Sequence, residues 1–171
     1  MTRPFLTSLS AACYSLGMLT LAQCGGSSSD AEGLAPSTIG SKVLNMMVTG
    51  ITDAAIDLPD ILNITTGDNG AFIAQTQGED IDMWNGAGIY SYTKTGKNTA
   101  ELSLSYNRND GSSSEPNTLV STIRIPQLTF ENASHASSGE GGASISYMKA
   151  EDRQPIPIDG ITISVNIISQ S

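Results

Sequence analysis

The segment Ile89–Tyr106 reads IYSYTKTGKNTAELSLSY and determines how the rest of the chain is interpreted. Aromatic or aliphatic residues alternate with polar ones on both sides of a central Thr-Gly-Lys-Asn. A period of two is typical of a strand that buries one face, and a short polar sequence between two such runs is typical of a tight turn. The segment therefore predicts a β-hairpin.

The loop length of this hairpin sets its register. A three-residue loop of Gly96, Lys97 and Asn98 places Tyr92 opposite Leu102 and Tyr90 opposite Leu104, whereas a two-residue loop would scatter the apolar residues over both faces. In the three-residue form we expect Asn98 to take the left-handed backbone conformation. Each aromatic–aliphatic pair contributes about 0.2–1 kcal/mol. A slip by one residue would turn the apolar set to water.

The rest of the chain repeats this pattern without a helical period over ten or more residues. Residues 132–142 are small and polar, and 154–160 read as an extended connector before the last strand. Because short strands recur about every 8–12 residues, we predict an all-β fold, a single antiparallel barrel or barrel-like sandwich of about 8–9 strands. Further strands are expected at 42–49, 61–66, 71–76, 81–84, 118–131, 143–148 and 161–168.

One of these strands changes phase. Ile123 and Ile125 precede Pro126 at odd positions, but Leu128 and Phe130 follow it at even positions. One extra residue in a strand restores the inward face, and proline cannot donate to the strand ladder. We therefore predict a β-bulge or break at Pro126-Gln127.

The N-terminus predicts export. Residues 1–23 begin with a basic Arg3 and continue with a mostly apolar run, as in a secretion signal. The sequence Leu21-Ala22-Gln23-Cys24 resembles the lipobox of bacterial lipoproteins, which implies lipidation of Cys24; Gln23 departs from the small residue of that pattern. Residues 24–33 are rich in Gly and Ser and predict a flexible tether. The β domain is then 34–171.

These features predict a membrane as partner and the bacterial envelope as location. The lipid on Cys24 would anchor the domain to a membrane of the bacterial envelope, with secretion without an anchor as the alternative. Gly25 after the Cys resembles the outer-membrane sorting choice of enterobacterial-type lipoproteins, which implies the outer membrane. Cys13 lies in the signal, so no free thiol or disulfide remains for the mature domain. All seventeen acidic residues follow Cys24 whereas Arg3 precedes it, so the net charge of −9 becomes −10. Nucleic acid and anionic membrane surfaces are therefore not expected partners.

The hairpin also carries a family resemblance. Tyr90–Leu102, followed by Leu128-Thr-Phe130, resembles a module of uncharacterised bacterial secreted and surface proteins with the pattern Y-x-Y-T-K-x-G-x-N-T-A-x-L and a later L-T-F. The resemblance implies a small lipocalin-like antiparallel barrel and no particular activity.

Catalytic and metal chemistry find little support in the sequence. His135 is the single histidine and lies in a small-residue stretch, so we expect a solvated loop histidine rather than a catalytic base. Zinc lacks ligands, and the acidic stretches 68–69, 79–82 and 107–115 do not match the spacing of a calcium loop. No metal, cofactor or catalytic residue is predicted. Trp84 could stack on a sugar, but a core position at a barrel end is the more common role.

The expected function is a non-enzymatic binding or structural role for a tethered domain, with an unknown protein or small-molecule partner. The first alternative is a lipocalin-like carrier, whose apolar ligand would lie in a cavity of several hundred Å³. Its lining would be Tyr90, Tyr92, Leu102, Leu104 and Trp84. A carbohydrate-active or hydrolytic enzyme is the second alternative.

Overall fold

All strands of the domain belong to a single antiparallel β-sheet. The computed structural model describes residues 33–50, 61–77, 84–108, 119–148 and 154–169, and these contain no α-helix. The prediction of an all-β fold is confirmed. The strands are β1 (Lys42–Gly50), β2 (Ile61–Thr66), β3 (Ala71–Thr76), β4 (Gly86–Lys94), β5 (Thr99–Arg108), β6 (Leu119–Asn132), β7 (His135–Ser137), β8 (Ala143–Met148) and β9 (Pro155–Ser169). Of the strand expected at 81–84, residues 81–83 lie outside the described ranges, and Trp84 precedes β4 without joining a strand.

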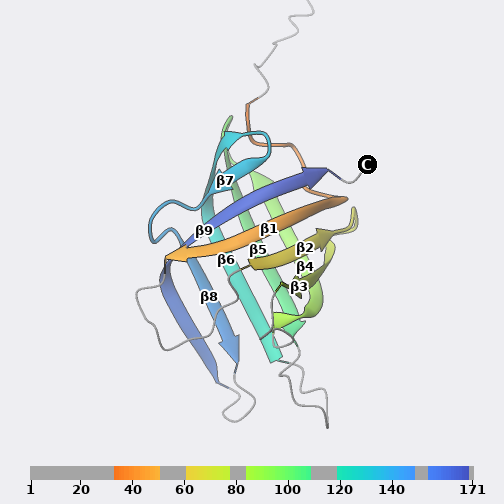
Figure 1. The fold of residues 1–171 in the computed structure, drawn as a ribbon, viewed down its shortest axis with the longest axis vertical. Helices are drawn as coiled ribbons and strands as arrows, with labels where there is room; N and C mark the ends of the chain where they lie inside the picture. The colour runs from red at the N-terminus through yellow and green to blue at the C-terminus, as the bar shows by residue number, and fades with distance from the viewer. Residues whose placement is uncertain (1–32, 51–60, 78–83, 109–118, 149–153, 170–171) are drawn as a thin grey trace, which may run out of the picture. The chain divides into compact units, whose positions relative to one another are not determined.

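The sheet closes into a barrel because β1 pairs with both β2 and β9 (Figure 1). Between β6 and β9 the wall is built from two short strands. β7 pairs with the end of β6 around Phe130, and β8 pairs with its start around Ile123. The result is an eight-stranded closed barrel with one extra strand. Of the two architectures predicted, the barrel is therefore correct.

The β4–β5 hairpin has the predicted register. Tyr92 lies opposite Leu102, and Tyr90 lies opposite Leu104. The Thr95 N–H donates to the Thr99 carbonyl at 2.9 Å, which closes the loop of three residues. The left-handed conformation predicted for Asn98 is wrong, because Ser41 is the non-glycine residue with positive φ among those described. Asn98 instead holds neighbouring segments: its carbonyl accepts from the Phe130 N–H at 2.8 Å.

The predicted bulge at Pro126-Gln127 is confirmed. Ala100 pairs with Leu128 while Leu102 pairs with Ile125, so two residues of β6 stand opposite one residue of β5. Both bulge residues are exposed, whereas Ile125 and Leu128 on either side are buried. The extra residue thus keeps the apolar side chains of β6 inside the barrel across the change of phase.

Two predicted connections are strands. The small polar stretch contains β7, and the expected connector 154–160 forms the first part of β9. In that part Ile156 pairs with Tyr147 of β8, and the prolines point outward. Gly160 has φ +75°. Near it the register between β8 and β9 shifts: Ile145 pairs with Ile158, but Ala143 pairs with Ile161. The strand therefore bends at Gly160, and it changes phase as β6 does.

Side chains of the described residues fill the inside of the barrel. An eight-stranded barrel is just wide enough for its inward side chains to meet at the axis. The buried residues form one continuous apolar cluster. Its largest fully buried members are Ile39, Leu44, Ile64, Leu102, Leu104, Ile125, Leu128, Ile161, Ile163 and Val165.

Candidate functional site

The predicted ligand-lining residues lie in three different settings. Leu102 and Leu104 are buried in the centre of the core cluster. Tyr90 and Tyr92 are half-buried at the end of the barrel that holds the hairpin loop, and Trp84 is buried near the opposite end. A ligand role for these residues remains a prediction. Cys24 lies outside the described residues.

Both tyrosines use their hydroxyl groups to hold backbone segments. The Tyr92 hydroxyl donates to the Pro36 carbonyl at 2.8 Å, and the Tyr90 hydroxyl donates to the Gly67 carbonyl at 2.9 Å. Burial raises the pKa of Tyr92 to about 12. The pKa of Tyr90 is also raised, by burial and then by the negative charge of Asp68. Both side chains stay neutral donors at physiological pH.

The segment Leu34–Ser41, which we call the strap, lies against this end of the barrel, before β1 (Figure 1). The Leu34 N–H donates to Asn98 Oδ1 at 3.0 Å, and the Ala35 N–H donates to the Lys97 carbonyl at 3.1 Å. Lys94 Nζ in turn donates to the Ala35 carbonyl at 2.7 Å. The strap is therefore fastened to the tip of the β4–β5 hairpin.

Side chains of the strap complete the core at this end. Ala35 and Ile39 are buried and belong to the core cluster. Thr66, also buried, donates its hydroxyl to the Ile39 carbonyl and accepts from the Lys42 N–H at 3.1 Å. These contacts satisfy polar groups that the barrel end would otherwise bury without partners. The strap end is thus closed by apolar contacts and by hydrogen bonds together.

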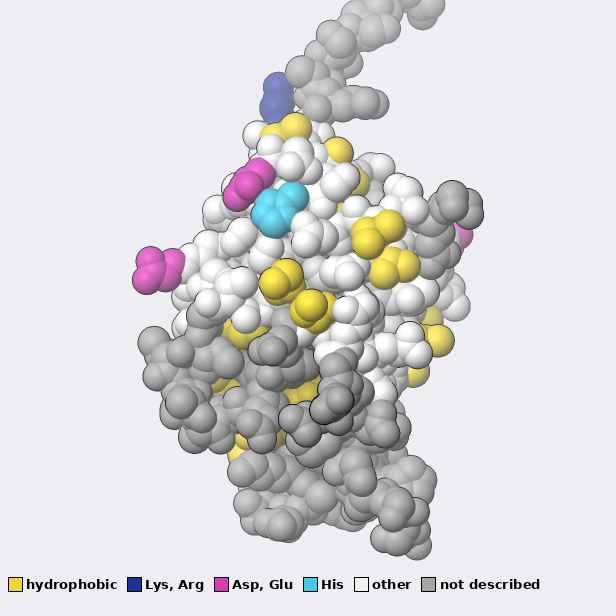
Figure 2. Space-filling model, viewed as in Figure 1, with side chains coloured by type: hydrophobic (Ala, Val, Ile, Leu, Met, Phe, Trp, Pro, Cys, Tyr) yellow, Lys and Arg dark blue, Asp and Glu magenta, His cyan; other side chains and the backbone are white. Residues whose placement is uncertain are grey.

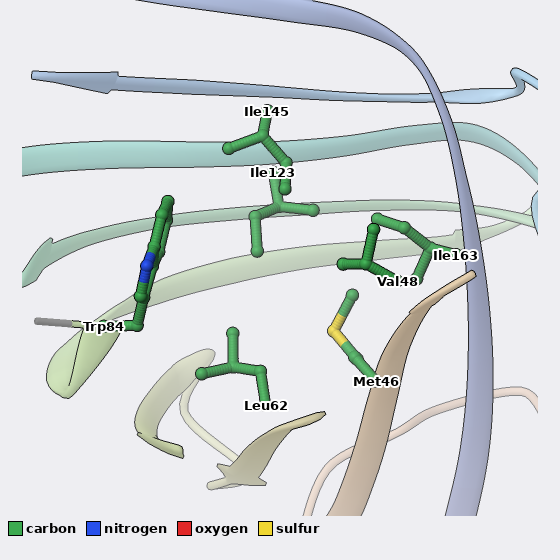
Figure 3. A pocket seen from close by; sticks show the side chains of 7 residues that line it. All are labelled: Met46, Val48, Leu62, Trp84, Ile123, Ile145 and Ile163. Atoms are coloured by element: carbon green, nitrogen blue, oxygen red, sulfur yellow. The ribbon is translucent and has the colours of Figure 1, made fainter. Parts of the chain in front are cut away.

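A small cavity lies nearer the other end of the interior. Met46, Leu62 and Ile163 point into it from β1, β2 and β9, and Trp84 covers one side (Figure 3). Its volume is about 10 Å³, which is at the lower limit for one water molecule. The remaining lining residues are Val48, Ile123 and Ile145. The wall is entirely apolar, so this space offers no polar group to orient a ligand.

An aromatic and cationic cluster lies beside the cavity. The guanidinium carbon of Arg108 is 4.9 Å from the ring centre of Trp84 and 5.5 Å from that of Tyr147, which is the geometry of cation–π contacts. Arg108 Nη2 also donates to the Met148 carbonyl at 2.8 Å. Trp84 is only 4% exposed. Its position agrees with a core role at the barrel end, since Arg108 and Tyr147 occupy its surroundings.

Two buried hydroxyl groups accompany this cluster. Tyr106 and Ser121 are directly opposite each other on β5 and β6, and both point into the barrel. Neither hydroxyl has a hydrogen-bond partner within the described part of the chain. Burial raises the pKa of Tyr106, and the nearby charge of Arg108 opposes that rise. The sequence analysis did not single out these residues. The alternation Leu102, Leu104, Tyr106 on β5 places Tyr106 inside, and Ser121 has the same phase as Ile123 and Ile125 on β6.

His135 is not in a loop, so that part of the prediction is wrong. It lies in β7, with 34% of its side chain exposed. Its Nδ1 is 2.7 Å from Asn166 Oδ1, and its Nε2 is 3.8 Å from Glu131 Oε2. A strand forms here because His135, Ala136 and Ser137 pair on both sides, with β6 and with β9.

The described residues lack both a cluster of metal ligands and a membrane-spanning helix. In the described ranges, no three His, Cys, Asp or Glu side chains come together so that they could hold a metal ion. Of the acidic stretches considered for calcium, 79–82 and most of 107–115 lie outside those ranges. The described residues also contain no helix of sufficient length and apolarity to span a bilayer.

Known proteins offer no guide to this barrel. No family model matches the chain, and no curated protein or solved structure matches it either.

Proposed function

We propose that the protein is a lipid-anchored, non-enzymatic domain of the bacterial envelope, attached through Cys24, which acts through the outer surface of its barrel. The observation that carries this proposal is the filled interior. Leu102 and Leu104 occupy the place where a carrier would hold its ligand, and the cavity near Trp84 measures about 10 Å³. Ligand pockets usually enclose about 300–1,000 Å³.

The carrier alternative requires the interior to open. A ligand of several carbon atoms would have to displace side chains such as Met46, Leu62 and Ile163 from the cavity wall. Core side chains are close-packed, so such a displacement exposes apolar surface and costs free energy. The outer surface needs no rearrangement to meet a partner. This difference favours a surface role over ligand transport.

Membrane attachment is tested by the mass and location of the mature chain. We expect a mature protein that begins at Cys24, carries acyl chains and is found in the membrane fraction. The Cys24→Ser variant should lose the acyl mass and leave that fraction. A mature protein cut elsewhere and free of lipid would remove the anchor from the proposal and favour simple secretion.

The filled interior is tested by ligand titration with Trp84 as the reporter, since it is the single tryptophan of the chain. Sodium dodecanoate and benzene should leave the Trp84 emission of the wild-type protein unchanged. The Ile163→Ala variant is the matched control, because it enlarges the cavity that Trp84 covers and should bind benzene. Saturable binding of dodecanoate to the wild-type protein would instead support the carrier.

A further inference from the structure

A row of amide side chains crosses the outside of the barrel. His135 pairs with Asn166, Asn166 with Asn45, Asn45 with Asn63, and Asn63 with Gln75. These residues come from β7, β9, β1, β2 and β3, five strands that are neighbours in the wall. Adjacent strands are about 4.8 Å apart, so the row extends over about 19 Å. It forms a continuous polar line that no single strand reveals.

Two further rows border the amides. One contains Ile168, Val43, Thr65 and Ile73, and the other contains Ser137, Ser164, Met47 and Ile61. We call these three rows together the amide face. Ile168 is 51% exposed, Ile73 is 55% exposed and Met47 is 38% exposed. Large aliphatic side chains are therefore open to solvent on both sides of the amides.

The three rows of the amide face contain no charged side chain, and the nearest carboxylate is that of Glu131, 3.8 Å from His135 at one end of the face. None of its outward residues named above is Asp, Glu, Lys or Arg, although the chain as a whole has a net charge of −9. Figure 2 shows this side of the barrel: white and yellow side chains cover most of it, and a magenta acidic side chain lies beside the cyan histidine. The outer face around β5 and β6 differs, because exposed Glu101 and Arg124 lie on it.

The amides of this face also have hydrogen-bonding capacity to spare. The Oδ1 atoms of Asn45 and Asn63 are shielded from solvent and accept no hydrogen bond within the described part of the chain. Each amide group carries both donors and acceptors. An exposed amide such as that of Gln75 can bond to a second copy directly, and the shielded Oδ1 atoms of Asn45 and Asn63 can do so when their side chains turn outward. A row of carboxylates or ammonium groups would repel its own copy.

From these observations we infer that the amide face is the interface with a second copy of this chain. Two mature molecules of charge −10 approach at the lowest electrostatic cost through a surface without charged side chains. A two-fold contact brings the same patch of both copies together and requires a self-complementary surface, which amides and aliphatic side chains provide. The three rows contain no Phe, Tyr or Trp ring to stack on a sugar, so their chemistry favours a protein over a glycan.

The test is the mass of the full mature protein in detergent, measured by light scattering over a hundredfold range of concentration with the detergent mass subtracted. We expect a dimer that dissociates on dilution. The double variant Ile73→Glu/Ile168→Glu should raise the dissociation constant at least tenfold, because it places charges in the contact. Val120→Glu is the matched control, since Val120 is 43% exposed on β6 outside the amide face, and it should dimerise as the wild type does.

Two further measurements keep the outcome decisive. Circular dichroism and Trp84 emission establish that the variants are folded, and Met47→Lys, on the third row, offers a second way to charge the face. A wild-type protein that stays monomeric throughout would overturn the inference, as would a double variant that dimerises normally. A monomer that cosediments with insoluble cellulose would assign the face to a glycan instead. None of these results depends on the lipid at Cys24.

Discussion

The two ends of the barrel interior use tyrosine in opposite ways. At the strap end the hydroxyls of Tyr90 and Tyr92 each donate to a backbone carbonyl. At the other end the hydroxyl of Tyr106 is buried deeper and has no hydrogen-bond partner among the described residues. A buried polar group without a partner carries its full desolvation cost, whereas a bonded one recovers most of it. Tyrosine hydroxyls therefore stabilise the strap end of the barrel, whereas at the other end the Tyr106 hydroxyl carries a desolvation cost that no hydrogen bond offsets.

The strap explains the difference. It brings the Pro36 carbonyl within reach of Tyr92, and it adds Ile39 to the core and the Ile39 carbonyl to the partners of Thr66. The opposite end relies on stacking, with Arg108 over Trp84 and Tyr147. We expect substitutions at the strap end to lower stability and removal of the Tyr106 hydroxyl to leave it unchanged or raise it.

The largest expected effect is the loss of the buried strap side chain. Ile39→Ala should lower the free energy of unfolding by about 2–5 kcal/mol, because it leaves a cavity in the core. Urea denaturation measures the change. Leu34→Ala is the control, since Leu34 is 37% exposed in the same strap and should change stability by less than about 0.5 kcal/mol. Equal losses in both variants would mean that the strap does not close the core.

The next effect concerns the hydrogen bonds beneath the strap. Thr66→Val keeps the shape of the side chain but removes the donor to the Ile39 carbonyl and the acceptor of the Lys42 N–H. We expect a loss of about 1–3 kcal/mol, because both backbone groups are left without their partner. Thr65→Val, at an exposed position of the same strand, should be close to neutral. A neutral Thr66→Val variant would contradict the proposed anchoring.

The tyrosines give the most direct comparison of the two ends. Tyr92→Phe should cost about 0.5–1.5 kcal/mol, the contribution of one hydrogen bond, whereas Tyr106→Phe should be neutral or stabilise the protein. Thermal and urea unfolding of both variants measure the difference in sign. If Tyr106→Phe were the more destabilising of the two, its hydroxyl would have to be bonded in solution.

The smallest effect is a pH dependence. The folded-state pKa of Tyr92 is about 12, above the ordinary value of 10.0, so the folded state holds this proton more tightly. Its contribution to stability is complete below pH 10 and is lost as the pH rises towards 12. Melting temperatures of the wild type should therefore fall more steeply over this interval than those of Tyr92→Phe. Parallel curves would show that Tyr92 is not responsible.

Local patterns predicted much of this fold. The pairs Tyr92–Leu102 and Tyr90–Leu104 followed from the loop length and the alternation of apolar residues, which together leave one register that buries the apolar side chains. The Pro126 bulge followed from a change of phase within one apolar strand. A change of phase also occurs at Asp159-Gly160. There the neighbouring prolines led to the prediction of a connector, although the segment is a strand.

The strap and the amide row could not be predicted in this way. β7 is three residues long and forms because β6 and β9 pair with it from both sides. Tyr92 donates to a carbonyl 56 positions away, and Tyr106 lies opposite a residue 15 positions away, and no periodicity encodes such distances. Asn45, Asn63 and Asn166 become neighbours only when the barrel closes.

The pairing of β1 with β9 also affects the order and the rate of folding. The hydrogen bond from Lys42 to Ser169 joins residues 127 positions apart, so the first strand waits for the last before the wall is complete. Folds dominated by such distant pairings fold slowly, in milliseconds to seconds. The barrel therefore cannot close until β9 has been synthesised, so its wall stays open while the strands before β9 are made.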